Sequence, residues 1–134
     1  MTTYVLDASV AVAAVRPSEP SHAVARNRLA LLLTGADDVV VPAIFDFEVT
    51  SALVRGQASP ASARRYLERD LGGRVLITIG PRAARAISAV AAKTRLRAAD
   101  AAYVWVAVSR GLPLVTLDLE IGQRAAGLCA IEAP

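Results

Sequence analysis

Short apolar runs alternate with longer segments along the whole sequence. Five runs rich in Val, Leu and Ile predict β-strands at residues 4–6, 39–41, 75–79, 114–117 and 128–131. The longer segments, which open on Ser or Pro or close on Gly, predict helices at residues 21–33, 43–55, 60–71, 81–94, 100–110 and 119–126. The strands show little polar–apolar alternation, which is typical of a parallel sheet covered on both faces. The pattern predicts an α/β fold with right-handed crossovers.

Length and composition fit one domain spanning residues 1–134, with 54% hydrophobic and only 20% charged residues. Cys129 and His22 are each the single residue of their type. One cysteine cannot form an intrachain disulfide or a zinc site built from cysteines, and one histidine excludes any mechanism that needs two. The longest apolar run, residues 101–108, is too short to span a bilayer, and no leader pattern is visible. We therefore expect a soluble, cytoplasmic protein with no membrane partner.

Two aspartates follow predicted strands directly. Asp7 comes after residues 4–6, and Asp118 comes after residues 114–117. The carboxyl ends of parallel strands share one edge of the sheet, and ligands of open α/β sheets bind there. Each aspartate could instead form a turn or cap a helix.

Two further acids lie on predicted helices that are otherwise apolar. Glu48 shares a face of helix 43–55 with Ile44 and Ala52, and it either points inward or reaches solvent at the helix edge. Asp46 lies on another face, where we expect it to be solvated. Asp100 begins helix 100–110, which is apolar all round, so it is either a buried acid or a helix cap.

If these four acids converge, they must repel one another at low dielectric. No lysine or histidine lies near any of them in the sequence, whereas a divalent cation such as Mg²⁺ or Mn²⁺ would neutralise them with oxygen ligands. Such a site activates water for attack on a phosphodiester. The net charge is +3 and 14 of the 15 basic residues are arginine, which suits phosphate binding, although a GC-rich genome would give the same excess.

The chain resembles the PIN-domain ribonucleases, specifically the VapC toxins of bacterial toxin–antitoxin pairs. The resemblance is carried in order by residues 5–10, 41–53, 96–104 and 114–118, over essentially the whole chain. It implies a single PIN-like domain with a five-stranded parallel sheet flanked by helices on both faces. It also implies a Mg²⁺- or Mn²⁺-dependent endoribonuclease that cuts structured RNA such as tRNA or rRNA.

Under this resemblance Asp7, Glu48, Asp100 and Asp118 fall on the acidic metal-binding positions of the family, and we call them the acidic quartet. Ser9 and Thr116 fall where small hydroxyls assist the site, or they only bond to turns. Glu120 is a candidate further acid, or an ordinary acid at the start of a helix.

The resemblance also implies partners. Family members are typically homodimers inhibited by a small antitoxin, here a VapB-like protein, which lays a segment into an apolar groove and often directs a basic side chain at the acids. Residues 10–15 and helix 43–55 are the expected groove walls, unless they are ordinary core. Arg64, Arg65 and Arg69 crowd one helix, where they either contact RNA or form a solvated face.

Three other readings compete with this one. A phosphotransfer receiver needs an aspartate after the middle strand, where Gly80 stands, and a lysine after a late strand, whereas Lys93 lies in a predicted helix. A haloacid-dehalogenase-type phosphatase needs an aspartate two residues after the first, where Ser9 stands. A PIN domain that only binds RNA or a protein remains open, although the complete acidic quartet argues against it.

Overall fold

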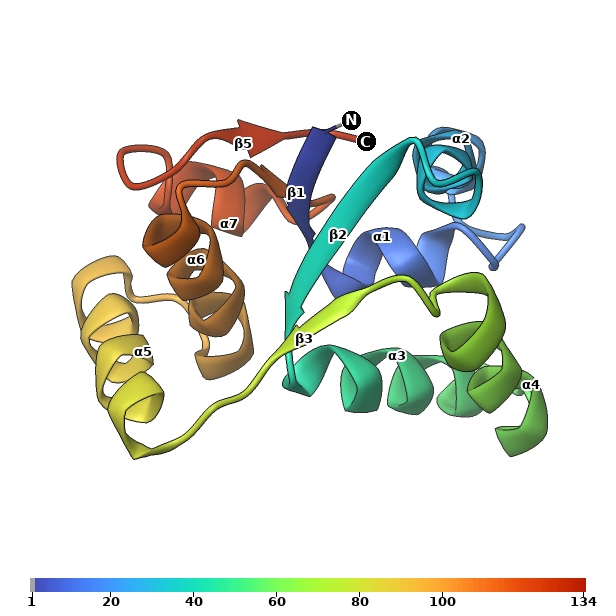
Figure 1. Cartoon of the computed structure of the whole chain (residues 1–134), viewed down its shortest axis with the longest axis horizontal. Helices are drawn as coiled ribbons and strands as arrows, with labels where there is room; N and C mark the ends of the chain where they lie inside the picture. Colours follow the sequence, from blue (N-terminus) through green and yellow to red (C-terminus); the bar gives the residue numbers. More distant parts are fainter. Residues whose placement is uncertain (1) are drawn as a thin grey trace.

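The computed structural model describes residues 2–134, which form a five-stranded, wholly parallel sheet (Figure 1). The strand order is β3-β2-β1-β4-β5. The strands are β1 (Thr2–Leu6), β2 (Asp37–Pro42), β3 (Val75–Ile77), β4 (Leu114–Val115) and β5 (Ile131–Glu132). The predicted α/β class and the parallel sheet are confirmed.

Helices cover both faces of the sheet, with α1 to α4 on one side and α5 to α7 on the other (Figure 1). They are α1 (Ala8–Ala13), α2 (His22–Leu33), α3 (Ile44–Arg55), α4 (Pro60–Arg65), the π-helical η1 (Tyr66–Asp70), α5 (Pro81–Thr94), α6 (Ala98–Arg110) and α7 (Leu119–Arg124). Helix α6 packs on β1, β2 and β4, while α5 packs on the outer side of α6. Because α6 is enclosed by the sheet and α5, it is apolar all round.

Strand β1 lies at the centre of the sheet and pairs with both β2 and β4. The chain builds outward from β1 through β2 to β3, and later returns to the other side of β1 as β4. Strand order therefore reverses between β1 and β4, and the loops after these two strands meet at the carboxyl edge. Asp7 and Asp118 lie in these loops.

Several predicted boundaries were wrong. The strand predicted at 114–117 ends at Val115, because its partner β5 ends at Glu132, whose carbonyl oxygen accepts the last inter-strand bond from the Thr116 amide. The last strand begins at Ile131, not at 128, because the Leu128 amide closes a turn with the Ala125 carbonyl. The helix predicted at 60–71 changes to π geometry at Tyr66. Helix α6 begins two residues before the predicted start, at Ala98.

The expectation that Asp46 is solvated was also wrong. Arg74, which precedes β3, forks onto the Asp46 carboxylate with nitrogen–oxygen distances of 2.8 and 2.7 Å. The same guanidinium donates to the carbonyl oxygens of Leu67 and Leu71, at the end of η1. One arginine thus ties α3 to the turn that leads into β3.

No helix within residues 2–134 is both long enough and apolar enough to cross a membrane.

The Arg74 contacts predict a measurable stability effect. Arg74→Ala removes the ion pair and leaves two partly buried carbonyls without their donor, so we expect the free energy of unfolding to fall by about 1.5–3 kcal/mol. Arg64→Ala, on the exposed surface of α4, should change it by less than about 0.5 kcal/mol. Urea denaturation of both variants beside the wild type measures this. Equal midpoints for the two variants would show that the Asp46–Arg74 pair is a surface contact only.

Candidate metal centre

The four members of the acidic quartet come from four elements that meet at the carboxyl edge of β1 and β4. Asp7 directly follows β1, Glu48 lies on α3, Asp100 is in the first turn of α6, and Asp118 directly precedes α7. Each acid lies close enough to others for their charges to interact: Asp7 with Asp118, Glu48 with Asp7 and Asp100, and Asp100 with Asp118. The structure therefore brings the quartet together.

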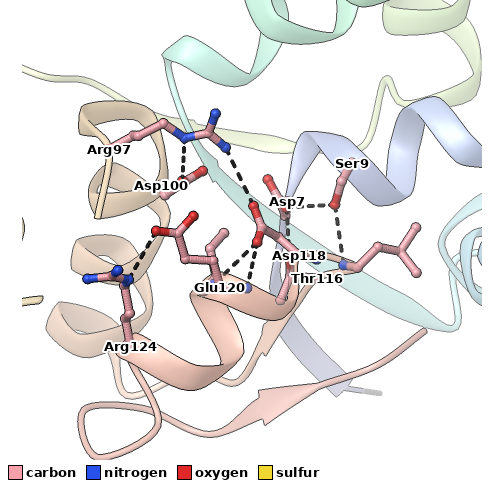
Figure 2. A network of polar contacts seen from close by, with 10 residues as sticks. Asp7, Ser9, Arg97, Asp100, Thr116, Asp118, Glu120 and Arg124 are labelled. Atoms are coloured by element: carbon pink, nitrogen blue, oxygen red, sulfur yellow. Dashed lines mark hydrogen bonds and ion pairs between the residues drawn. The ribbon is translucent and has the colours of Figure 1, made fainter. Parts of the chain in front are cut away.

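Asp7 is only 6% exposed and is held by two hydroxyl groups (Figure 2). Ser9 and Thr116 both donate to its Oδ2, over 2.6 and 2.7 Å. The same hydroxyls accept backbone N–H bonds from Leu117 and Asp118, which fixes the loop after β4 against the start of α1. Burial raises the pKa of Asp7 although these bonds favour its ionised form.

The alternative reading of Asp7 as a helix cap does not hold. Asp7 occupies the N-cap position of α1, but its side chain makes no capping bond. Ser9 and Thr116 make both kinds of contact that the sequence allowed, since each hydroxyl accepts from a turn amide and also donates to Asp7.

Glu48 is half-buried, and its Oε1 accepts a 2.6 Å hydrogen bond from the Tyr103 hydroxyl on α6. Burial raises the pKa of Glu48, and the charges of Asp7 and Asp100 act in the same direction. Tyr103 is fully buried and orients Glu48 across the site. Sequence reasoning missed Tyr103, because on an apolar helix it is indistinguishable from any core aromatic residue.

Asp100 is 8% exposed, and burial raises its pKa. The helix-cap reading fails here too, because the N-cap position of α6 belongs to Arg97 and Asp100 lies three residues further on. Asp118, in contrast, does cap its helix: its Oδ1 accepts from the amides of Glu120 and Ile121 over 2.8 and 3.4 Å. Its Oδ2 faces the quartet (Figure 2).

The side chain of Glu120 is engaged elsewhere. It forms a 3.0 Å ion pair with Arg124, one turn further along α7 (Figure 2). Arg124 also contacts the Thr94 carbonyl oxygen at the end of α5. The structure therefore favours the reading of Glu120 as an ordinary acid at the start of a helix.

A basic residue, Arg97, contacts two acids of the quartet. The Arg97 Nε lies 3.3 Å from Asp100 Oδ2, and its Nη2 lies 3.8 Å from Asp118 Oδ2 (Figure 2). The sequence carries one signal for this contact, an arginine three residues before an acid at a helix start.

The chemistry of these donors suits a hard divalent cation. The quartet offers carboxylate oxygens, and one oxygen of Asp7, Glu48 and Asp118 is already oriented by a hydroxyl or amide donor. Yet no three His, Cys, Asp or Glu side chains in residues 2–134 are arranged so as to hold a metal ion. Arg97 bridges Asp100 and Asp118 instead. The residues fit the cation by ligand type, and Arg97 would have to leave Asp100 and Asp118 for a cation to bind there.

The two segments predicted as groove walls both contribute to the core, and both border a hollow. Most of residues 10–15 is buried core, and Val15 is the exposed exception. Val15 and Leu53 border a hollow of about 430 Å³ whose other wall is α4 and η1, with Arg65 and Arg69 on its rim. Helix α4 lies at the end of α3 away from β2 (Figure 1), so these arginines border the hollow rather than the quartet.

Comparison with known proteins agrees with this architecture. The family model of the PIN domain matches residues 4–127. This chain belongs to the PIN-domain family. The family and the fold predicted from the sequence are therefore confirmed, and the acidic quartet of this PIN domain lies at the edge where its sheet reverses order.

Several solved structures share the fold of this PIN domain. PAE2754 from Pyrobaculum aerophilum is 25% identical with a TM-score of 0.72, over 97% of this chain and 83% of that one. VapBC2 from Rickettsia felis, bound to a DNA fragment from its promoter, is 14% identical with a TM-score of 0.72, over 98% of each chain. FitAcB from Neisseria gonorrhoeae is 21% identical with a TM-score of 0.69, over 96% and 95%. No curated protein matches the sequence.

The raised pKa values predict how stability depends on pH in metal-free buffer. In the folded protein Asp7, Glu48 and Asp100 hold protons that the unfolded chain releases at about pH 4. The free energy of unfolding should therefore fall as pH rises above about 4 toward the raised pKa values. Asp7→Asn removes one of these charges and keeps an oxygen for both hydroxyls, so at pH 7 it should melt at the same temperature as the wild type or higher.

This advantage of Asp7→Asn should shrink as pH falls toward about 4, where the wild-type acid is protonated as well. Thermal denaturation in EDTA between pH 4 and pH 8 measures it. Asp100→Asn serves as the parallel variant. A marked loss of stability at every pH would mean that the carboxylate is needed for the fold.

Proposed function

We propose that this PIN domain is a Mg²⁺- or Mn²⁺-dependent endoribonuclease, the toxin of a VapC-type toxin–antitoxin pair. The observation that carries the proposal is the convergence of the acidic quartet, from four separate elements, at the reversal point of a parallel sheet. Membership of the PIN-domain family supports the nuclease class. A catalytically silent domain would have no reason to keep four mutually repelling acids, three of them with raised pKa values.

In the proposed mechanism the acidic quartet would hold the metal. A bound divalent ion would lower the pKa of a coordinated water and offset the charge that builds up on the phosphate. The protein's own part is orientation. Ser9 and Thr116 fix Asp7, Tyr103 fixes Glu48, and the start of α7 fixes Asp118. Each of these bonds limits the rotation of an acid that would bind the ion, whereas Asp100 and Asp118 would also have to release Arg97.

The surface around Glu48 supports access by a polymer. Glu48 borders two open hollows that serve this access, one between α1 and α3 and one on the outer side of α3. Arg55 lies on the second and Ser9 on the first. A chain that crosses this junction could pass the quartet with nucleotides on both sides, as an endonuclease requires. RNA as the substrate comes from the VapC resemblance.

The partner that we propose is a VapB-like antitoxin. Two of the fold neighbours, VapBC2 and FitAB, are complexes bound to DNA, VapBC2 with a fragment from its promoter. The hollow lined by Val15, Leu53 and Tyr66 offers an apolar floor with a charged rim, which suits one segment of such a partner.

We also propose a homodimer. Phe47 is 64% exposed beside an almost entirely apolar hollow of about 420 Å³ that includes Ile44, Ile79 and Ile87. A second copy would cover this surface. Light scattering of the purified protein should give twice the mass of one chain, and the mass of one chain would contradict the proposal.

We also propose that the protein is located in the cytoplasm.

Metal binding and RNA cleavage should both depend on Glu48. Glu48→Gln keeps the bond from Tyr103 but removes one negative charge from the quartet. Because even the partners of metal ligands contribute about 10–100-fold to metal affinity, we expect Mn²⁺ affinity to fall by at least about tenfold. Cleavage of tRNA and rRNA should fall with it, while metal-free RNA binding is kept or improved. Calorimetric titration with Mn²⁺ and gel assays measure the two effects.

Glu68→Gln, an exposed change on η1 with the same loss of charge, is the matched control and should match the wild type. EDTA should abolish wild-type cleavage, and cleavage undiminished by EDTA would overturn the metal mechanism. Equal Mn²⁺ affinity and equal cleavage in Glu48→Gln would leave a centre of three acids. Metal binding without cleavage of any RNA would favour the silent binding module.

The antitoxin proposal makes a separate prediction about Val15. A small open reading frame next to this gene should encode a protein that co-purifies with the toxin and suppresses its cleavage. Val15→Glu places a charge on the floor of the hollow at an exposed position, so the fold and the nuclease activity should persist while antitoxin affinity falls by tenfold or more, at a cost of about 1–3 kcal/mol. Val24→Glu, exposed on α2, is the control. Unchanged affinity in Val15→Glu would move the antitoxin to another surface.

A further inference from the structure

Arg97 combines a fixed backbone with a side chain that is largely free. The preceding residue, Leu96, is buried, and its amide donates to the Thr94 hydroxyl over 3.2 Å. The Thr94 carbonyl oxygen is in turn contacted by Arg124 from α7. The connection between α5 and α6 is therefore anchored on both sides, while the side chain of Arg97 remains 75% exposed. Its guanidinium can change partners without any change in the backbone.

The contacts of Arg97 are shared between two acids from different elements. Its distances of 3.3 Å to Asp100 and 3.8 Å to Asp118 are longer than those of a paired fork, such as the 2.7 and 2.8 Å of Arg74 on Asp46. Exposed pairs of this kind are weak and exchangeable. Arg97 lies over the quartet as a loosely held counter-ion.

The nearby arginine of α7 does not share this role. Arg124 is occupied by Glu120 and by the Thr94 carbonyl oxygen, and Figure 2 shows it turned toward Glu120 and away from Asp7. The two arginines thus contact different acids. Arg124 binds the acid outside the quartet, and Arg97 binds two acids within it.

The side chain of Arg97 also does not stabilise the start of α6. It stands at the N-cap position of α6, yet its side chain makes no capping bond. Residues chosen for capping are Ser, Thr, Asp or Asn, so arginine at this place contributes nothing to helix initiation. The side chain therefore contacts Asp100 and Asp118, and replacing it should not change the capping of α6.

We propose that Arg97 is an exchangeable counter-ion, which occupies Asp100 and Asp118 in the absence of metal and is displaced by the divalent cation onto a phosphate of the RNA. The inference rests on the proposed metal-dependent function and adds a residue that couples metal binding to substrate binding. Arg97 contacts one oxygen of Asp100 and, on Asp118, the oxygen that does not cap α7, so a metal cation held by these two acids would compete with the guanidinium. Once displaced, Arg97 stays tethered beside the site with its fork free for a phosphate.

The first measurement is metal affinity, which needs no RNA. Mn²⁺ is titrated calorimetrically into metal-free wild type, Arg97→Gln, Arg97→Lys and Arg110→Gln. Arg110→Gln removes the same charge from the far, exposed end of α6 and controls for the general field. Arg97→Gln should bind Mn²⁺ several-fold more tightly than the wild type and than Arg110→Gln. Arg97→Lys, which keeps the charge, should lie close to the wild type.

The second measurement is affinity for a labelled single-stranded RNA, with and without Ca²⁺, on RNA that a gel shows to be intact. Metal should tighten RNA binding by the wild type more than by Arg97→Gln, because only the wild type gains a released arginine. With Ca²⁺ present, the dependence of log affinity on log salt should be shallower in Arg97→Gln by about 0.7, the value of one contact to single-stranded phosphate.

The outcomes separate the inference from the proposed function. If neither the wild type nor Arg97→Gln binds Mn²⁺, the metal-dependent function fails and this inference fails with it. If the wild type binds Mn²⁺ and Arg97→Gln binds it equally or more weakly, the function stands and the exchange is overturned. Tighter Mn²⁺ binding with unchanged coupling to RNA would overturn the transfer of Arg97 to phosphate.

Discussion

A carboxylate that is almost removed from water is the constraint on which the rest of this site depends. Asp7 follows the central strand of the sheet, where burial disfavours its charge. Two hydroxyl donors offset part of that cost, and both are tied to the loop after β4. Positioning Asp7 therefore also positions Asp118, whose amide bonds to one of the same hydroxyls. The site is organised outward from this one buried charge.

The remaining ties follow the same rule, in which an acid is held by a group from another element. Tyr103 of α6 holds Glu48 of α3, and the start of α7 holds Asp118. Burial and mutual proximity raise the pKa values of three acids of the quartet. The neutral donors bring no opposing charge, so the carboxylates of the quartet still repel one another, and a nearby cation lowers this repulsion. Arg97 supplies one such positive charge from within the chain.

The sequence was a good guide wherever local patterns decide the structure. Apolar runs located four of the five strands and reached the first residue of the fifth, and aspartates at strand ends marked the edge of the candidate site, because the carboxyl ends of parallel strands must meet there. It failed where partners distant in sequence decide. The pairing of Asp46 with Arg74 bridges 28 positions and that of Glu48 with Tyr103 bridges 55, and neither residue type nor spacing reveals such contacts. Arg97, three residues before Asp100, is the exception, because arginine and aspartate at this spacing on a helix can pair locally.

The bond from Thr116 to Asp7 joins residues 109 positions apart, through neighbouring central strands of the sheet. The first acid of the site is translated almost at the start, whereas the hydroxyl that orients it and the last acid arrive only near the end. A growing or truncated chain that stops before β4 has an incomplete sheet and lacks both Asp118 and the Thr116 hydroxyl. For the ribonuclease that we propose, this order of assembly would withhold activity from the polypeptide while it is still attached to the ribosome that makes it.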